Sequence, residues 1–126
     1  MEAVTFENMS GVLIRLFPEL SVDYQNLVDW WDGDTPGSHV VFGDILNPYI
    51  LSLLETKHDQ EKLRAIFDFL ERLAKHEDKR VQEVIMMTVC ERLAGSKEQL
   101  HKARSYMGPV TRRFSEEIET FWKGGK

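Results

Sequence analysis

Residues that could bind a metal or act as a nucleophile are few and widely spaced in this chain of 126 residues. A zinc site needs several convergent ligands, and two histidines four residues apart on one helix are a common arrangement. No two of the four histidines have that spacing, so we predict no metal site and no cofactor; they are His39, His58, His76 and His101. The single cysteine, Cys90, lies in the apolar run IMMTVC, which favours a buried structural thiol over a nucleophile.

The common catalytic motifs are missing from the sequence. It contains no G-x-S-x-G, no H-E-x-x-H and no phosphate-binding G-x-x-x-x-G-K-[ST]. Cys90 has no histidine at a motif spacing, although a partner could be distant in the sequence. We therefore expect that the protein is not an enzyme. A small enzyme or ligand-binding protein, with a pocket near His39, Asp44 and His76, stays open as an alternative.

The most unusual local composition is the acidic and aromatic segment DWWDGD at positions 29–34. Interfaces favour exposed aromatic side chains as anchors, and carboxylates around an anchor suit a partner rich in Arg or Lys. The predicted partner-binding residues are Asp29, Trp30, Asp32 and Asp34. The alternative is that Trp30 and Trp31 are both buried under the following loop and that the aspartates serve only the turn.

His39 and Asp44 bracket the short apolar segment VVFG. This segment could be an isolated extended piece or the lead-in to a helix. We interpret it as an extended, buried connector, because a lone strand would have no sheet to join. Irregular buried backbone needs polar partners, so His39 and Asp44 are predicted to meet and to hold the connector against the helices. A ligand site at these two residues is the alternative.

The elements that must position these residues are helices. Apolar residues recur at helical spacing in most of the chain, and most notably in two amphipathic patterns between Leu63 and Leu93. The expected caps and breakers are Thr5, Pro18, Ser21, Asp44 or Asn47, Asp59, Asp78, Gly95, Ser96 and Pro109. Residues 84–90 are apolar almost all round, which predicts the most buried helix, with Met86 and Met87 as packing residues.

About seven helices with short connections predict an all-α fold in a single domain over residues 1–126, frayed from about residue 123. The antiparallel pairs suggest stacked helical hairpins, as in a short HEAT or armadillo-like array. The internal repeat is not strict, so an irregular helical bundle is the competing architecture.

Charge and hydropathy narrow the classes of partner. The net charge is −5, which argues against nucleic acid and suits a basic protein partner, although mild acidity could serve only solubility. No signal peptide is visible and no apolar stretch approaches the roughly 20 residues of a membrane span. We therefore expect a cytoplasmic protein that binds neither membrane nor nucleic acid; its oligomeric state stays open.

Two short runs carry a resemblance to a known family. HVVFGD precedes a helix, and YMGPVTRR precedes an acidic helix. The chain resembles a bacterial family of small, acidic, all-helical proteins associated with immunity to polymorphic toxins. The family pattern P-H-V-x-x-G-D is matched here at His39, Val40, Gly43 and Asp44, while Gly37 and Ser38 stand where the residues before the histidine vary.

This resemblance implies an inhibitor that binds a cognate toxin domain in the cytoplasm, and it implies no catalytic residue. Toxin domains that cut nucleic acid are often basic, so an acidic partner would associate faster through electrostatic steering. The first hypothesis is thus a non-enzymatic immunity protein. The second is a helical scaffold or adaptor that self-associates through its repeat-like faces.

Overall fold

The computed structural model describes residues 3–31, 35–56 and 59–124, and within these ranges every regular element is helical. The prediction of an all-α fold with about seven helices is confirmed, because the elements join into seven continuous segments. The segments are α1 (Met9–Leu16), η1 (Pro18–Leu20) with α2 (Ser21–Trp30), α3 (Ser38–Val41) with η2 (Phe42–Leu46) and α4 (Asn47–Thr56), α5 (Gln60–Ala74), α6 (Lys79–Glu83) with η3 (Val84–Cys90) and α7 (Glu91–Leu93), α8 (Lys97–Arg104) and α9 (Pro109–Gly124).

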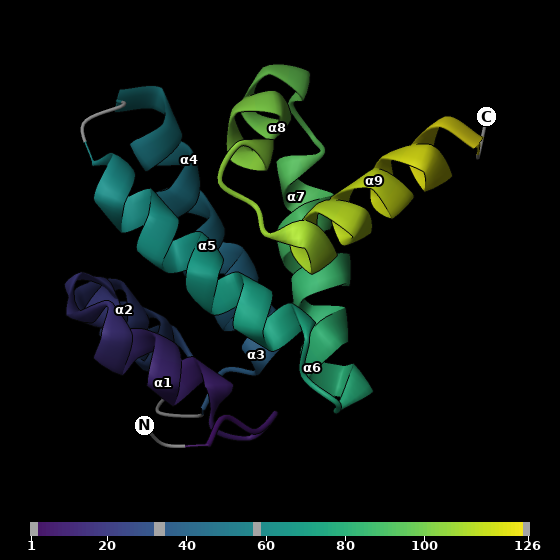
Figure 1. Cartoon of the computed structure of the whole chain (residues 1–126). Helices are drawn as coiled ribbons and strands as arrows, with labels where there is room; N and C mark the ends of the chain where they lie inside the picture. Colours follow the sequence, from purple (N-terminus) through teal and green to yellow (C-terminus); the bar gives the residue numbers. More distant parts are fainter. Residues whose placement is uncertain (1–2, 32–34, 57–58, 125–126) are drawn as a thin grey trace.

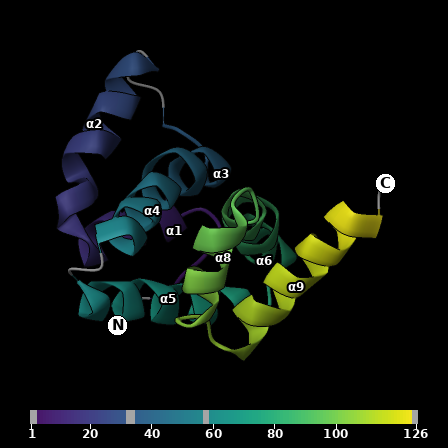
Figure 2. The ribbon, with the colours of Figure 1, turned by 90° about the horizontal axis from the view of Figure 1, so that it is seen from above.

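The helices form an irregular bundle, which is one of the two architectures that the sequence left open. Figure 1 shows α5 across the middle of the molecule, with α1 and α2 on one side and α6 to α9 on the other. Figure 2 shows that α2 and α9 extend away from the body at opposite ends. None of the described helices is both long enough and apolar enough to cross a bilayer.

The core is centred on α5 and η3, as the patterns between Leu63 and Leu93 predict. Phe67 and Leu70 of α5 and Val84, Ile85 and Val89 of η3 have essentially no exposed surface. One expectation in this region is wrong, since Met87 is 49% exposed and does not pack in the core. The segment is a π-helix, whose wider turn puts residues 84, 85 and 88–90 on the inner face and Met87 on the outer face.

Local signals place most of the helix ends correctly. The carboxylates of Asp59 and Asp78 accept hydrogen bonds from the Lys62 and Arg80 amides, both at 2.9 Å, and cap α5 and α6. The Ser96 hydroxyl accepts from the Gln99 amide at 3.4 Å and caps α8. Pro109 occupies the first position of α9, where its missing N–H leaves no hydrogen bond unmade.

Thr5 was expected to cap the first helix, but α1 begins at Met9 with Asn8 as its N-cap, and Thr5 instead closes the turn before it through a reciprocal pair of hydrogen bonds. The Asn8 amide donates to Thr5 Oγ1 at 3.1 Å, and the Thr5 amide donates to Asn8 Oδ1 at 2.7 Å. Ser21, in contrast, lies inside the helix that it was expected to cap, because η1 already turns the chain before α2 begins.

The prediction of an extended connector at residues 39–43 is wrong. Helix α3 begins at Ser38, after the extended residue Gly37, and continues through η2 into α4 without interruption. Asp44 and Asn47 are therefore interior helix residues and not helix starts. Tertiary packing overrides the β preference of the Val-Val-Phe run, because Val41 and Phe42 are fully buried against the core.

The single thiol of the chain, at Cys90, is fully buried. The thiol has no exposed surface, its sulfur lies 3.9 Å from the Thr111 carbonyl oxygen, and burial raises the pKa of Cys90 to about 12. We expect iodoacetamide at pH 8 to leave the native protein unmodified and to label one thiol in denaturing urea, as mass spectrometry would record. Equal labelling rates with and without urea would contradict this burial.

Candidate functional site

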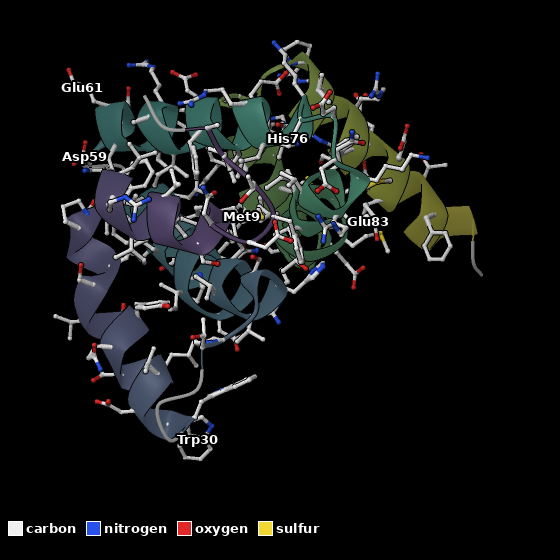
Figure 3. The ribbon with its side chains drawn as sticks, turned by 90° about the horizontal axis from the view of Figure 1, so that it is seen from below. Met9, Trp30, Asp59, Glu61, His76 and Glu83 are labelled. Carbon is white, nitrogen blue, oxygen red and sulfur yellow. The ribbon has the colours of Figure 1, made fainter. Side chains whose placement is uncertain are left out.

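Helix α2 is the least packed helix of the fold, since none of its residues is buried. Figure 3 shows that it extends from the body with Trp30 near its tip. Trp30 is 81% exposed and Trp31 is 39% exposed. Trp is among the most buried residue types on average, so an indole this exposed at the end of a projecting helix is a notable feature of the surface.

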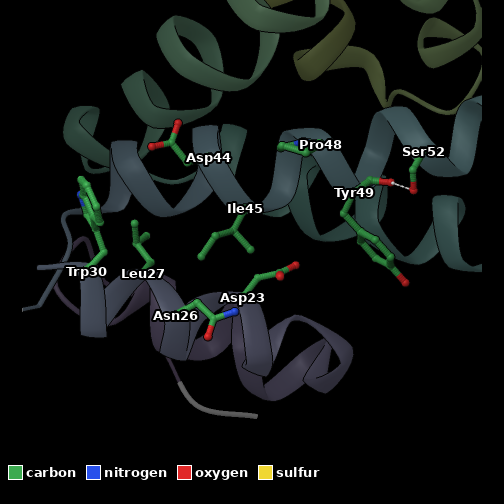
Figure 4. A pocket seen from close by; sticks show the side chains of 9 residues that line it. All are labelled: Asp23, Asn26, Leu27, Trp30, Asp44, Ile45, Pro48, Tyr49 and Ser52. Carbon is green, nitrogen blue, oxygen red and sulfur yellow. Dashed lines mark hydrogen bonds between the residues drawn. The ribbon is translucent and has the colours of Figure 1, made fainter. Parts of the chain in front are cut away.

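A groove of about 670 Å³ runs between α2 and the η2–α4 segment, and we call it the α2 groove. Figure 4 shows the two walls running in opposite directions, with Trp30 near Asp44 at one end and Asp23 near Tyr49 at the other. The α2 wall uses positions three and four apart, so a single helix face lines the groove. The lining residues are Asp23, Asn26, Leu27 and Trp30 from α2, and Asp44, Ile45, Pro48, Tyr49 and Ser52 from the other wall.

Tyr49, at one end of the α2 groove, belongs to a hydrogen-bonded network that includes Glu19 and Lys62. The Tyr49 hydroxyl donates to Glu19 Oε2 at 2.8 Å, and Lys62 Nζ lies 2.9 Å from the same oxygen and 5.5 Å from the centre of the Phe17 ring. Burial, with the Glu19 carboxylate as acceptor, raises the pKa of Tyr49, so the hydroxyl stays a donor. The base of α2 is thereby tied to α4 and α5, while its Trp30 end projects.

The α2 groove has an acidic rim. Asp23 has no cationic partner among the described residues, and Asp29 accepts only the side-chain amide of Gln25, at 3.1 Å. Asp44 uses Oδ1 to pair with Arg92 at 2.8 Å. Within the described part of the chain no Lys or Arg lines the groove, so its uncompensated charge is negative.

The structure brings together only part of the segment that sequence reasoning singled out. Trp30 lines the α2 groove, and Asp29 is exposed beside it on the same helix without lining the groove. Asp32 and Asp34 lie outside the described residues. Sequence reasoning missed Asp23 and the whole opposite wall. The spacing of Asp23, Asn26, Leu27 and Trp30 was a usable signal for one wall, but nothing local marks which helix lies opposite.

His39 and Asp44 contact the same helical segment through different residues. His39 Nδ1 lies 2.5 Å from Thr88 Oγ1, and Asp44 pairs with Arg92. A second, smaller cavity of about 230 Å³ lies there; it is lined by His39, Val40, Asp44, Met87, Thr88, Glu91 and Arg92. Both residues therefore link η2 and its flanks to η3 and α7, in place of the direct contact across an extended connector that we expected.

His76 is not part of that cavity. Its Nδ1 accepts the Asp78 amide at 3.0 Å, so its Nε2 carries the proton and donates to the Val4 carbonyl at 2.7 Å. The ring fastens the N-terminal segment to the corner between α5 and α6. Among the described residues no group of three or more His, Cys, Asp or Glu side chains is placed to hold a metal ion.

The two runs that carry the family resemblance lie at helix contacts. In HVVFGD, Gly43 allows the close approach of Thr88 and Arg92. In YMGPVTRR, Thr111 binds the Glu71 carboxylate and Tyr106 stacks on Phe67, with ring centres 6.2 Å apart. These runs thus join helices within the body, and the α2 groove lies outside them except at Asp44.

Comparison with known proteins places the chain in a family. A family model described as a domain of unknown function, DUF7674, matches residues 11–123, a range that includes both walls of the α2 groove. No curated protein and no solved structure matches the chain. Because the family match spans most of the sequence, the chain belongs to the DUF7674 family.

Proposed function

We propose that this chain is a non-enzymatic protein-binding protein, a bacterial immunity protein that binds and neutralises a basic toxin domain through the α2 groove. The observation that carries the proposal is the 81% exposure of Trp30, a residue that lines the α2 groove. Trp is strongly enriched among the residues that dominate binding energy, and an indole this exposed offers a large apolar surface that a partner can cover.

The charge of the α2 groove supports a basic partner. Asp23 and Asp29 are uncompensated, and the chain as a whole carries a net charge of −5. A basic domain would be steered to this surface, which raises the association rate at low ionic strength. Its Arg or Lys side chains could also stack on the Trp30 ring.

The inhibitor role rests on the resemblance to immunity proteins and is tested by growth rescue. The chain is co-expressed with the product of the adjacent gene, and colony formation is compared with that of cells lacking the chain. The proposal expects rescue and a 1:1 complex in calorimetry. If growth is not rescued and no complex forms, the proposal is wrong. A stable homodimer without a heterologous partner would favour the scaffold alternative.

Trp30→Ala is expected to weaken the complex by about 30-fold or more, the effect of losing an interface anchor worth about 2 kcal/mol. Helical circular dichroism should stay unchanged, because an exposed side chain contributes little to stability. Two matched controls are Val22→Ala, on the outer face of α2, and Phe121→Ala, an aromatic 73% exposed on α9. If either control weakens the complex as much as Trp30→Ala does, the contact surface is elsewhere.

A further inference from the structure

We infer that the α2 groove receives a basic amphipathic helix of the partner, with one cationic side chain at Trp30 and Asp44 and a second at Asp23. The inference rests on the proposed function and specifies the element of the partner that the groove recognises. It follows from the backbone of the walls, from the apolar floor and from the spacing of the acidic positions.

The two walls of the α2 groove favour a helical segment of the partner over an extended one. Both are helices, whose backbone N–H and C=O groups are used within the helices themselves. An extended segment would find no strand edge to pair with, and its own polar backbone would face Leu27, Ile45 and Pro48. A helix satisfies its backbone internally, so it can cover these apolar side chains without leaving hydrogen bonds unmade.

The floor defines the apolar stripe of the occupant. Leu27 of α2 is half-buried and lies beside Ile45, and Pro48 lies further along the opposite wall of the α2 groove (Figure 4). Side chains at helix positions i+3 and i+4 of the occupant would cover them, as in other helix-in-groove complexes. Covering Leu27 and Pro48 would supply the apolar part of the binding energy.

The acidic ends define the basic positions of the occupant. Trp30 lies seven residues after Asp23, which is about 10 Å along a helix. Cations at positions i and i+7 of the occupant span the same distance and flank the apolar stripe on one face. At one end a cation would stack on Trp30 and reach the second carboxylate oxygen of Asp44, since Arg92 contacts Oδ1.

The test uses a helix-stapled synthetic peptide with Arg at i and i+7 and Leu at i+3 and i+4, titrated into the isotope-labelled full chain. We expect NMR shifts at the Trp30 indole, the Asn26 side-chain amide and the Ile45 amide. Replacing both Arg by Glu should abolish binding. A peptide of the same composition with its two Arg on opposite helix faces should bind several-fold more weakly, because only one of them can reach an acidic end.

Variants of the chain test the two ends separately. Trp30→Ala should weaken peptide binding about tenfold through lost cation–π and apolar contact, and Asp23→Asn about threefold through a lost exposed ion pair. Val22→Ala and Asp68→Asn, an exposed carboxylate on α5, should bind like the wild type. Binding of the Glu peptide as tight as that of the Arg peptide, or equal effects of Asp23→Asn and Asp68→Asn, would overturn the inference.

The outcomes separate this inference from the proposed function. If the partner complex depends on Trp30 but the basic helix gives no shifts in the α2 groove, the inference fails while the binding function stands. If the basic helix binds with the expected register and growth rescue fails, the groove's specificity is supported and the immunity role is not.

Discussion

Glu71→Ala is expected to lower the free energy of unfolding by about 3 kcal/mol, because three hydrogen-bond donors at the start of α9 lose a charged acceptor. Glu71 is 8% exposed, and its carboxylate accepts three hydrogen bonds at the start of α9. The donors are the Val110 amide at 3.0 Å, the Thr111 amide at 2.9 Å and the Thr111 hydroxyl at 2.8 Å. The substitution leaves these donors without their acceptor, and urea denaturation at pH 7 measures the loss.

Glu71→Gln is the matched control, because it keeps the volume and one acceptor oxygen. We expect it to lose roughly half as much stability, since charged acceptors form hydrogen bonds about twice as strong as neutral ones. Gly108→Ala should disturb the same contact by crowding the carboxylate, because a Cβ on Gly108 would lie 2.5 Å from Glu71 Cδ. If Glu71→Ala proved as stable as the wild type, the carboxylate would not be the cap of α9.

The contribution of Glu71 should depend on pH. Burial alone would raise the pKa of Glu71, but the hydrogen bonds from Thr111 and Val110, with Lys75 nearby, together outweigh it and hold the pKa below 4.5. The carboxylate therefore stabilises the folded state fully above the unfolded value of 4.5, and this stabilisation is lost as the pH falls through the folded value. The stability gap between wild type and Glu71→Gln should thus narrow between pH 6 and pH 3; an unchanged gap would contradict this.

The starts of helices could be predicted from the sequence where the capping residue lies within a few residues of the amide that it binds. Asp59, Asp78 and Ser96 cap helices by hydrogen bonds to amides only two or three residues away, so their spacing alone is informative. Glu71 shows the limit of this reasoning. It caps α9, which begins 38 residues later at Pro109. No pattern within a single helix reveals such a distant partner.

The α2 groove shows the same limit for the site. The unusual composition around Trp30 pointed to an exposed aromatic, and its exposure agrees with that interpretation. The sequence predicted a helix beginning at Asp44 or Asn47 that includes Pro48, but nothing in it showed that α2 packs beside this helix to form the groove. Residues 39–43, which were expected to be extended, are helical, with Val41 and Phe42 fully buried in the core, and Asp44 both pairs with Arg92 and lines the groove.

Gly43→Val is expected to lower the free energy of unfolding by about 1–3 kcal/mol, the usual range for overpacking a filled interior. A Cβ at Gly43 would lie 2.8 Å from Arg92 Cζ and 3.0 Å from Thr88 Cγ2. Arg92 could swing out to solvent, but it would then lose its hydrogen bonds to the Gly43 carbonyl and to Asp44, both at 2.8 Å. Thr88 cannot move as easily, because it is part of buried η3.

A comparison with Gly11→Ala separates the effect of the close approach of Thr88 and Arg92 to Gly43 from the effect of helix propensity. Alanine is favoured over glycine inside a helix by about 0.5–1 kcal/mol, so Gly11→Ala, whose Cβ would meet only the Arg15 guanidinium at 3.4 Å, should stabilise the protein. Gly43→Ala gains the same propensity but should still destabilise. In an Arg92→Ala background the loss caused by Gly43→Ala should shrink by about 0.5 kcal/mol or more, because one of the two obstructing side chains is gone.

Gly43→Ala should lower the stability of the protein and at the same time strengthen its binding of the Arg peptide. Displacing Arg92 leaves Asp44 as an uncompensated carboxylate at the Trp30 end of the α2 groove, while Trp30 and Asp23 are untouched. We therefore expect Gly43→Ala to unfold at lower urea concentration and yet to bind the Arg peptide about twofold more tightly, the effect of one additional exposed ion pair. Weaker peptide binding by this variant would mean that Arg92 orients Asp44 for the partner, and that the pair functions as a unit.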